Sequence, residues 1–202
     1  WMDVIELLNR IERHFAASVE AKQRTLIESG AQIVKGAEHL AEQLRRGHKI
    51  LICGKGGSAA RAQHLAAELT NRFEIERPGL AAIALTTDSS ALTSIANDYA
   101  FEQVFARQLR ALGRPGDVLL ALSTSGDSPN VIAAMDAAKQ LEISTIALTG
   151  RDGGRMAQQL SGADIEIRVR GTATARIQET HILIIHCLCD LVDRLLFGKE
   201  RS

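Results

Sequence analysis

The stretch from Asp117 to Asn130, DVLLALSTSGDSPN, constrains the fold of this chain more than any other. Val118 to Leu122 is a nearly continuous apolar run, which is typical of a strand covered on both faces. A turn rich in hydroxyl groups follows this run, and the segment from Val131 to Leu141 then has the pattern of an amphipathic helix. The stretch therefore predicts a strand, a tight turn and a helix in direct succession.

The turn after this strand has the composition of an anion site. Ser123, Thr124, Ser125 and Ser128 place four hydroxyls around Gly126. The N–H groups at the start of a helix lack internal partners, the helix dipole adds partial positive charge, and short hydroxyls can approach a small oxyanion. Alternatively, Ser128 is only an N-cap and the other hydroxyls are ordinary turn residues. Four hydroxyls in six residues exceed what one cap requires, so the sequence favours an anion site.

From residue 49 onwards, strand and helix patterns alternate. Strands are expected at 49–53, 80–85, 117–122, 143–148 and 164–169, with helices between them and a last, largely apolar helix from about Thr174 to Phe197. This order predicts an α/β fold with a five-stranded parallel sheet flanked by helices. Ligands of such sheets bind beyond the carboxyl ends of the strands, near the switch in strand order.

Two helices are expected before the first strand. Residues 3–29 carry apolar side chains at helical spacing, and a second helix follows Gly30 and ends near Gly47. Their apolar stripe could cover one face of the sheet or pack on another subunit, and the sequence leaves both open.

The composition excludes several classes of function. The 24 Lys and Arg residues balance 24 Asp and Glu residues, so the charge gives no indication of a nucleic-acid or acidic-membrane partner. No apolar run approaches the roughly 20 residues of a membrane span. The N-terminus lacks a signal-peptide pattern and the three cysteines are an odd number, so we expect a cytoplasmic protein whose cysteines lie in the core. We expect one domain over residues 1–202, with a helical extension over 3–47 and an α/β core over 48–202.

A glycine-rich loop follows the first expected strand. Gly54, Gly56 and Ala59 match G-x-G-x-x-A, a dinucleotide fingerprint that is weak on its own. That fingerprint needs an acidic residue at the end of the next strand, some 20 residues on. Asp88 is more than 30 residues past the loop, so a nicotinamide oxidoreductase is disfavoured.

Two helices carry groups that could hold a metal or move protons. His64 and Glu68 are four residues apart and share a helix face, which suits a metal or proton transfer but equally suits an exposed ion pair. His186 lies among apolar residues, where an imidazole needs a ligand or a backbone partner. Gln178 is about 12 Å from His186 along the helix axis. Both could reach one small site only from opposite ends or from two copies of the helix, which indicates a site at a subunit interface.

Six motifs together resemble the sugar isomerase (SIS) family: CGKGGSAARAQHLAAEL, ALTTDSS, IANDY, GDVLLALSTSGDS, ALTGRDGG and RIQETHILIIH. The resemblance covers nearly the whole chain and implies a flavodoxin-like three-layer sandwich. It also implies an aldose–ketose isomerase that interconverts sedoheptulose 7-phosphate and D-glycero-D-manno-heptose 7-phosphate through an enediol. This reaction is the first step towards the heptose of bacterial lipopolysaccharide. The implied assembly is a homotetramer with sites between subunits.

The family pattern also implies roles for particular residues. Ser123, Thr124, Ser125 and Ser128 match the phosphate cradle. The rest of the implied substrate site comprises Lys55, Gly56, Gly57, Ser58, Asn97, Asp98 and Gln178. The family's metal positions, usually one zinc per subunit, match His64, Glu68, Gln178 and His186. Glu68 and His186 match the acid/base pair, and our hypothesis is that Glu68 takes the proton from carbon while His186 handles the hydroxyl proton.

The chain departs from the family pattern at Lys55, where Asn is usual, and at Arg61, where an acidic residue is common. Both changes add positive charge beside the implied site, and Lys55 could pair with the phosphate or repel a metal. The chain also resembles a non-enzymatic branch, a tetramer that binds the bacterial replication initiator, in RFEIERP near Arg72 and CLCDL near Cys187. Those regulators lack the residues that match Glu68 and His186, so their presence here favours the enzyme.

Overall fold

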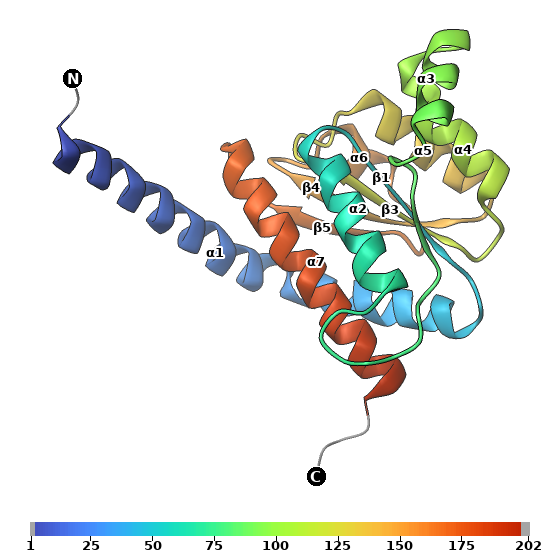
Figure 1. Cartoon of the computed structure of the whole chain (residues 1–202), viewed down its shortest axis with the longest axis horizontal. Helices are drawn as coiled ribbons and strands as arrows, with labels where there is room; N and C mark the ends of the chain where they lie inside the picture. Colours follow the sequence, from blue (N-terminus) through green and yellow to red (C-terminus); the bar gives the residue numbers. More distant parts are fainter. Residues whose placement is uncertain (1–2, 199–202) are drawn as a thin grey trace.

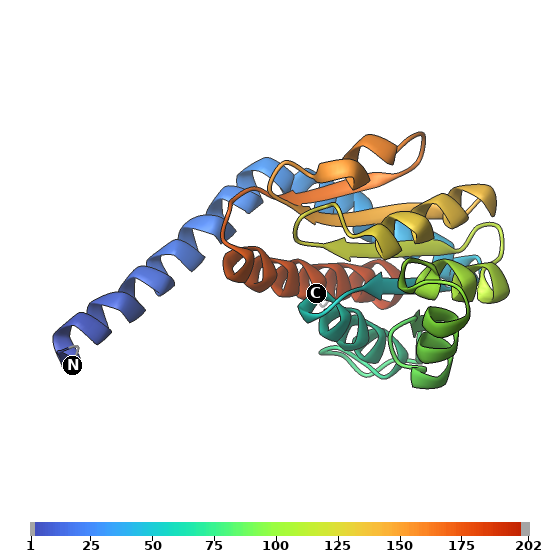
Figure 2. The ribbon, with the colours of Figure 1, turned by 90° about the horizontal axis from the view of Figure 1, so that it is seen from above.

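The computed structural model describes residues 3–198, in which a parallel five-stranded sheet lies between two layers of helices (Figures 1 and 2). The strand order is β2-β1-β3-β4-β5. The strands are β1 (Ile50–Gly54), β2 (Ala82–Ala84), β3 (Val118–Ser123), β4 (Ser144–Gly150) and β5 (Ile165–Val169). The predicted α/β fold is confirmed, and the strand ends differ from the sequence-based bounds by at most two residues.

The helices divide between the two faces of the sheet. Those on one face are α1 (Val4–Arg45), α2 (Gly57–Thr70) and α7 (Thr174–Phe197). The opposite face is covered by α3 (Ser89–Asp98), the 3₁₀ turn η1 (Phe101–Gln103), α4 (Val104–Leu112), α5 (Pro129–Gln140) and α6 (Gly154–Gln159). The last helix has the bounds that the sequence predicts.

The central strands are apolar throughout because both of their faces are covered. Ile50 and Ile52 point to the cluster under α1, α2 and α7. Leu51 and Cys53 point to the cluster on the other side. All residues of β1 and β3 are buried. These two strands therefore hold in place the starting points of the glycine loop after β1 and of the hydroxyl-rich turn after β3.

The switch in strand order lies between β1 and β3. From β1 the chain moves to β2 on one side, and from β3 it moves to β4 on the other. Gly54 at the end of β1 is paired in register with Leu122 of β3. The glycine loop and the hydroxyl-rich turn therefore begin side by side, at the position where ligands of such sheets bind.

The expected N-terminal pair of helices is wrong, because Val4–Arg45 is one continuous helix. Gly30 lies inside it and not at its end. A glycine within a helix costs about 1 kcal/mol relative to alanine. Burial of Ile33, Ala37 and Leu40 against the sheet outweighs that cost, since one buried large apolar side chain contributes about 1.5–3 kcal/mol.

The two halves of α1 have different surroundings. The second half packs beneath the sheet, whereas the first half projects away from the body of the molecule (Figure 2). Apolar side chains along the first half are therefore exposed, including Phe15 at 72% and Ile27 at 85%. This half of α1 therefore has no apolar partner within the described residues that covers Phe15 or Ile27.

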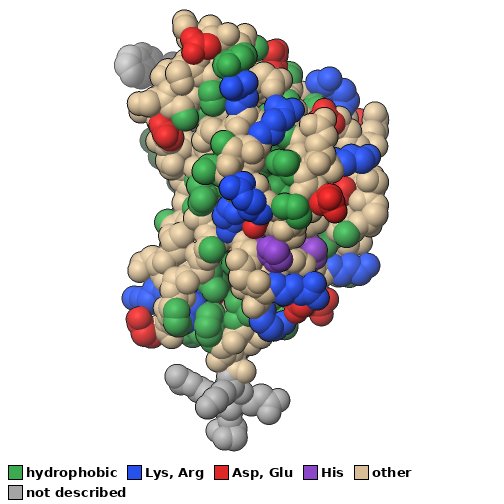
Figure 3. All heavy atoms as spheres, turned by 90° about the vertical axis from the view of Figure 1, so that its right-hand side faces the viewer, with side chains coloured by type: hydrophobic (Ala, Val, Ile, Leu, Met, Phe, Trp, Pro, Cys, Tyr) green, Lys and Arg blue, Asp and Glu red, His purple; other side chains and the backbone are tan. Residues whose placement is uncertain are grey.

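The rest of the surface is mixed in character. Among the described residues, no helix has a long and apolar enough stretch to cross a bilayer. On the face drawn in Figure 3, Lys and Arg side chains are interspersed with acidic and apolar ones. This distribution agrees with the equal numbers of basic and acidic residues in the chain.

Candidate active site

Helices α2 and α7 lie side by side (Figure 1), and their contact, the α2–α7 seam, brings three candidate residues together. His64 Nε2 lies 3.0 Å from His186 Nε2 and 3.4 Å from Glu68 Oε1. The ring of Phe73 stacks on His186 with centroids 5.6 Å apart. Groups that are far apart in the sequence thus meet at one partly buried position, where a carboxylate and two imidazoles can exchange protons.

Pairs of donor atoms in this cluster have separations close to those between two ligands of one zinc ion. Ligand bonds of about 2.0–2.1 Å at a tetrahedral zinc place two ligand atoms about 3.3–3.5 Å apart. The distances of 3.0 Å and 3.4 Å are close to that range. Among residues 3–198, however, no three or more His, Cys, Asp or Glu residues are arranged as a ligand set. The described side chains therefore supply compatible pairs and not a closed site.

Gln178 lies at the other end of the seam. A Cβ atom on Gly57 would lie only 2.5 Å from Gln178 Nε2, so a larger residue at this position would push the Gln178 amide aside. Arg61 Nε donates to the Gln178 carbonyl at 2.9 Å, and the Arg61 guanidinium also donates to the Gly57 carbonyl. His64 is seven residues, or about 10 Å, further along α2 than Gly57. Within one chain, Gln178 and His186 therefore belong to opposite ends of the seam.

Arg61, one of the two departures from the family pattern, links two helices. Besides its bonds to Gly57 and Gln178, it lies near Glu179, which accepts from Arg176 at 2.6 Å. Burial lowers the pKa of the Arg61 guanidinium, and the Glu179 carboxylate opposes that shift. Lys55, the other departure, is exposed in the glycine loop.

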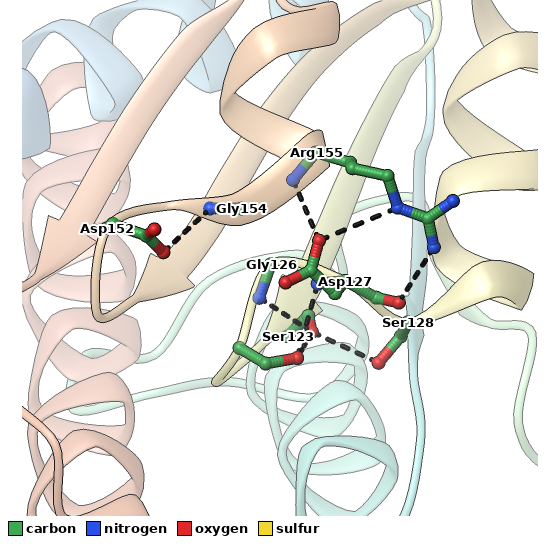
Figure 4. Close-up of polar contacts among 8 residues, drawn as sticks. Ser123, Gly126, Asp127, Ser128, Asp152, Gly154 and Arg155 are labelled. Carbon is green, nitrogen blue, oxygen red and sulfur yellow. Dashed lines mark hydrogen bonds and ion pairs between the residues drawn. The ribbon is translucent and has the colours of Figure 1, made fainter.

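The hydroxyl turn, residues 123–128, closes on itself at the end of β3 (Figure 4). Ser123 Oγ accepts from the Gly126 N–H at 3.1 Å and lies 3.1 Å from Ser128 Oγ. Ser125 Oγ is 3.4 Å from Ser123 Oγ. Ser128 occupies the N-cap position of α5, but its side chain makes no capping bond. The hydroxyls thus gather beside the helix start, as the anion-site interpretation requires.

The turn that follows β4 packs against the hydroxyl turn and supports it (Figure 4). Gly126 has a φ of +72°, and a Cβ atom there would collide with the Gly153 carbonyl. Met156 N–H donates to the Gly126 carbonyl, and Arg155 N–H donates to Asp127 Oδ1, both at 2.9 Å. A cavity of about 730 Å³ opens beside this pair of turns, lined by Ser125, Asp127, Arg151, Asp152, Arg170, Gly171 and Thr172.

Comparison with known proteins identifies the family. The sequence profile of the SIS domain matches residues 14–150. A phosphoheptose isomerase from Halorhodospira halophila is 59% identical over 189 residues, which are 94% of this chain and 96% of that protein. One from Methylococcus capsulatus is 60% identical over 190 residues, which are 94% of this chain and 97% of that protein.

The chain belongs to the SIS family.

Solved SIS-family structures agree with this assignment. A phosphoheptose isomerase from Neisseria gonorrhoeae matches with a TM-score of 0.86 at 52% identity. One from Francisella tularensis matches with a TM-score of 0.90 at 44% identity. Each match covers 93% of this chain and 98% of the other. The family resemblance inferred from the six motifs is confirmed.

Some substrate-site residues implied by the SIS resemblance lie away from the α2–α7 seam. Asn97 and Asp98 are exposed at the end of α3, where Asn97 Nδ2 donates to Asp98 Oδ1 at 2.9 Å. Since α3 lies on the opposite face of the sheet from α2 and α7, these two residues do not join the seam of their own chain. Gly56 has a φ of +59° before α2, and Ser58 is buried in its first turn.

Asp88, which lies too far past the glycine loop for the dinucleotide fingerprint, has a structural role. Its carboxylate accepts from the Ala91 N–H at 2.9 Å and caps α3. The cysteines are free thiols, and burial raises the pKa of both Cys53 and Cys189 to about 12. The expectation of core cysteines is confirmed for these two, whereas Cys187 is partly buried.

Sequence reasoning missed several buried polar residues, and two of them, Arg77 and His181, lie next to the α2–α7 seam. Arg77 is 7% exposed and pairs with Asp193, and no local signal indicates this pair because the two residues are 116 positions apart. His181 is fully buried, and its Nε2 donates to the Thr149 carbonyl at 2.8 Å. Burial lowers the pKa of His181 to about 4, Arg61 adds to that shift, and the bond to Thr149 opposes it.

Proposed function

We propose that this SIS-family protein is an isomerase that interconverts sedoheptulose 7-phosphate and D-glycero-D-manno-heptose 7-phosphate. The observation that carries the proposal is the meeting of His64, Glu68 and His186 in the α2–α7 seam. Similarity to phosphoheptose isomerases over nearly the full chain supports it. The initiator-binding alternative is not favoured, because Glu68 and His186 are both present and lie in the same cluster.

The reaction moves one proton between adjacent carbons and one between their oxygens. Glu68 takes the proton from the hydroxymethyl carbon of the ketose, which gives the enediol, and returns it to the neighbouring carbon. His186 moves the proton between the two oxygens. His64 contacts both groups and holds their side chains in orientation.

A metal ion would add electrostatic stabilisation to this scheme. His64, Glu68 and His186, together with Gln178 of a second copy of the chain, would offer imidazole nitrogens and oxygens of the type that zinc binds, with one ion per subunit. The chemistry that such an ion would supply is polarisation of the substrate carbonyl.

The phosphate group fits the hydroxyl turn at the start of α5. Ser123, Thr124, Ser125 and Ser128 supply hydroxyls, and the helix start supplies positive potential. Thr124 and Ser125 are partly exposed, so a ligand can approach these two residues from solvent.

A second copy of the chain would complete the site. Glu68 is eleven residues beyond Gly57, or about 16 Å further along α2. Asn97 and Asp98 lie on the far face of the sheet. We therefore place the sites between subunits of a homotetramer, with the exposed apolar half of α1 as one contact surface. A cytoplasmic location stays a prediction.

The deciding experiment is turnover of sedoheptulose 7-phosphate in deuterated water, followed by NMR. Aldose formation with deuterium at its second carbon is expected, because the carboxylic acid of Glu68 exchanges its proton with solvent. Parallel samples with a chelator and with added zinc show whether a metal is used, and light scattering gives the oligomeric state. If no sample forms the aldose, the proposal is wrong; capture of the replication initiator by that inactive protein would then support the regulator.

A further inference from the structure

One buried guanidinium joins the end of α2 to α7. Arg77 Nε donates to Asp193 Oδ1 at 2.7 Å, and the two side chains are only 1% and 4% exposed. The Nη2 atom donates to the Glu68 carbonyl at 2.9 Å, and Nη1 donates to the Leu69 carbonyl at 2.8 Å. Two weaker bonds at 3.1 Å reach the carbonyls of Asn71 and Pro78.

These contacts reach both members of the proposed acid/base pair. The Glu68 backbone itself accepts from Arg77. Asp193 is seven residues after His186, so the two side chains share a face of α7 two turns apart. The Arg77 side chain thus fixes the position of the last turn of α2 along the α7 axis. It thereby also fixes the position of Glu68 relative to His186 along that axis.

The chemistry of the pair favours a geometric role over a purely stabilising one. A buried ion pair often contributes no more stability than an apolar pair of similar volume. Asp193 Oδ2 is buried with no hydrogen-bond partner among the described residues, so the pair is not optimised for stability. A guanidinium, however, presents donors in a rigid plane, and this plane can set the positions of two helices in a way that a flexible ammonium cannot.

We propose that Arg77, held by Asp193, is a positioning residue for the isomerisation. It locks the end of α2 against α7 so that the Glu68 carboxylate meets the substrate carbon at the correct distance from His186. This inference rests on the proposed function of Glu68 and His186. The phosphate-binding turn lies outside these contacts, so the role concerns the chemical step and not substrate affinity.

The test uses three variants of the full-length protein, which are Arg77→Lys, Arg77→Gln and a double variant, each assayed well below its own melting temperature. Arg77→Lys keeps the charge opposite Asp193 but loses the planar donors, and we expect kcat to fall about 10- to 100-fold with KM within about threefold. The double variant Arg77→Gln/Asp193→Asn removes both buried charges. The double variant should melt at a higher temperature than Arg77→Gln alone, while its kcat should be as low as that of Arg77→Gln.

Asp117→Asn is the matched control. Asp117 is also a buried carboxylate, but it accepts from Lys49 and Arg114 and not from α2 or α7. Its loss should lower the melting temperature and leave kcat unchanged. If Arg77→Lys and the double variant keep wild-type kcat, or if kcat simply follows melting temperature across all variants, the inference is wrong. An inactive wild-type protein would overturn the proposed function and this inference together.

Discussion

The α2–α7 seam and the hydroxyl turn belong to the same proposed site but are built differently. In the turn, the serine hydroxyls bond to groups two to five positions away, as between Ser123 and Ser128, and Arg155 and Met156 support only Asp127 and the Gly126 carbonyl. In the seam, they join residues more than a hundred positions apart, as between His64 and His186. Local sequence can therefore set the geometry for anion binding, whereas the groups for proton transfer depend on how two helices pack.

Substitution of Glu68 should have the largest effect on turnover, because it removes the proton acceptor of the α2–α7 seam and leaves the hydroxyl turn intact. Glu68→Gln keeps the shape of the side chain but cannot accept the proton. We expect kcat to fall about 10³-fold, within the range for loss of a general base. Calorimetric binding of inorganic phosphate should be unchanged. Glu76→Gln is the control, because the Glu76 side chain is 91% exposed. We expect this variant to have wild-type turnover. Turnover of Glu68→Gln within tenfold of wild type would exclude the role.

Gly126→Ala is the reciprocal change, directed at the turn. A positive φ and the contact with the Gly153 carbonyl should together cost about 4 kcal/mol in the free energy of unfolding, and phosphate affinity should fall. Gly162→Ala separates the two causes, since Gly162 has a φ of +60° but nothing within 4 Å of its would-be Cβ atom. Urea denaturation should show a loss of only about 1–2 kcal/mol there. Equal losses at both glycines would show that the packing against Gly153 contributes nothing.

His181 joins α7 of the seam to Thr149 of β4, which is the register partner of Ser123 at the start of the hydroxyl turn. Its pKa is about 4 in the folded protein and 6.5 in the unfolded chain. The unfolded state therefore binds more protons between these values, and the free energy of unfolding decreases as pH falls from 6.5 to 4. The contribution is about 3 kcal/mol. His181→Gln should flatten this part of the urea-measured pH profile, whereas the exposed His14→Gln should leave it unchanged. A profile for His181→Gln that matches wild type would contradict the assignment.

The same contrast explains what the sequence could predict. Apolar runs and glycine turns are local signals, so the five strands, α7 and the hydroxyl turn were predictable. Continuation of α1 through Gly30 was not, because tertiary burial of Ile33 and Leu40 decides it. The separation of Gln178 from His186 could be anticipated from helix geometry. Arg77 could not be assigned from spacing, since its partners become neighbours only when α2 packs on α7.

The smallest effect tests whether Ser128 is a helix cap or part of an anion site. Its hydroxyl contacts Ser123 and does not cap α5, so Ser128→Ala should change the free energy of unfolding by less than about 0.5 kcal/mol while phosphate affinity falls several-fold. Asp88→Ala is the matched comparison, because Asp88 does cap α3 and its loss should cost about 1 kcal/mol with no effect on phosphate binding. If Ser128→Ala behaves like Asp88→Ala in both measurements, the hydroxyl turn is an ordinary helix start and the phosphate must bind elsewhere.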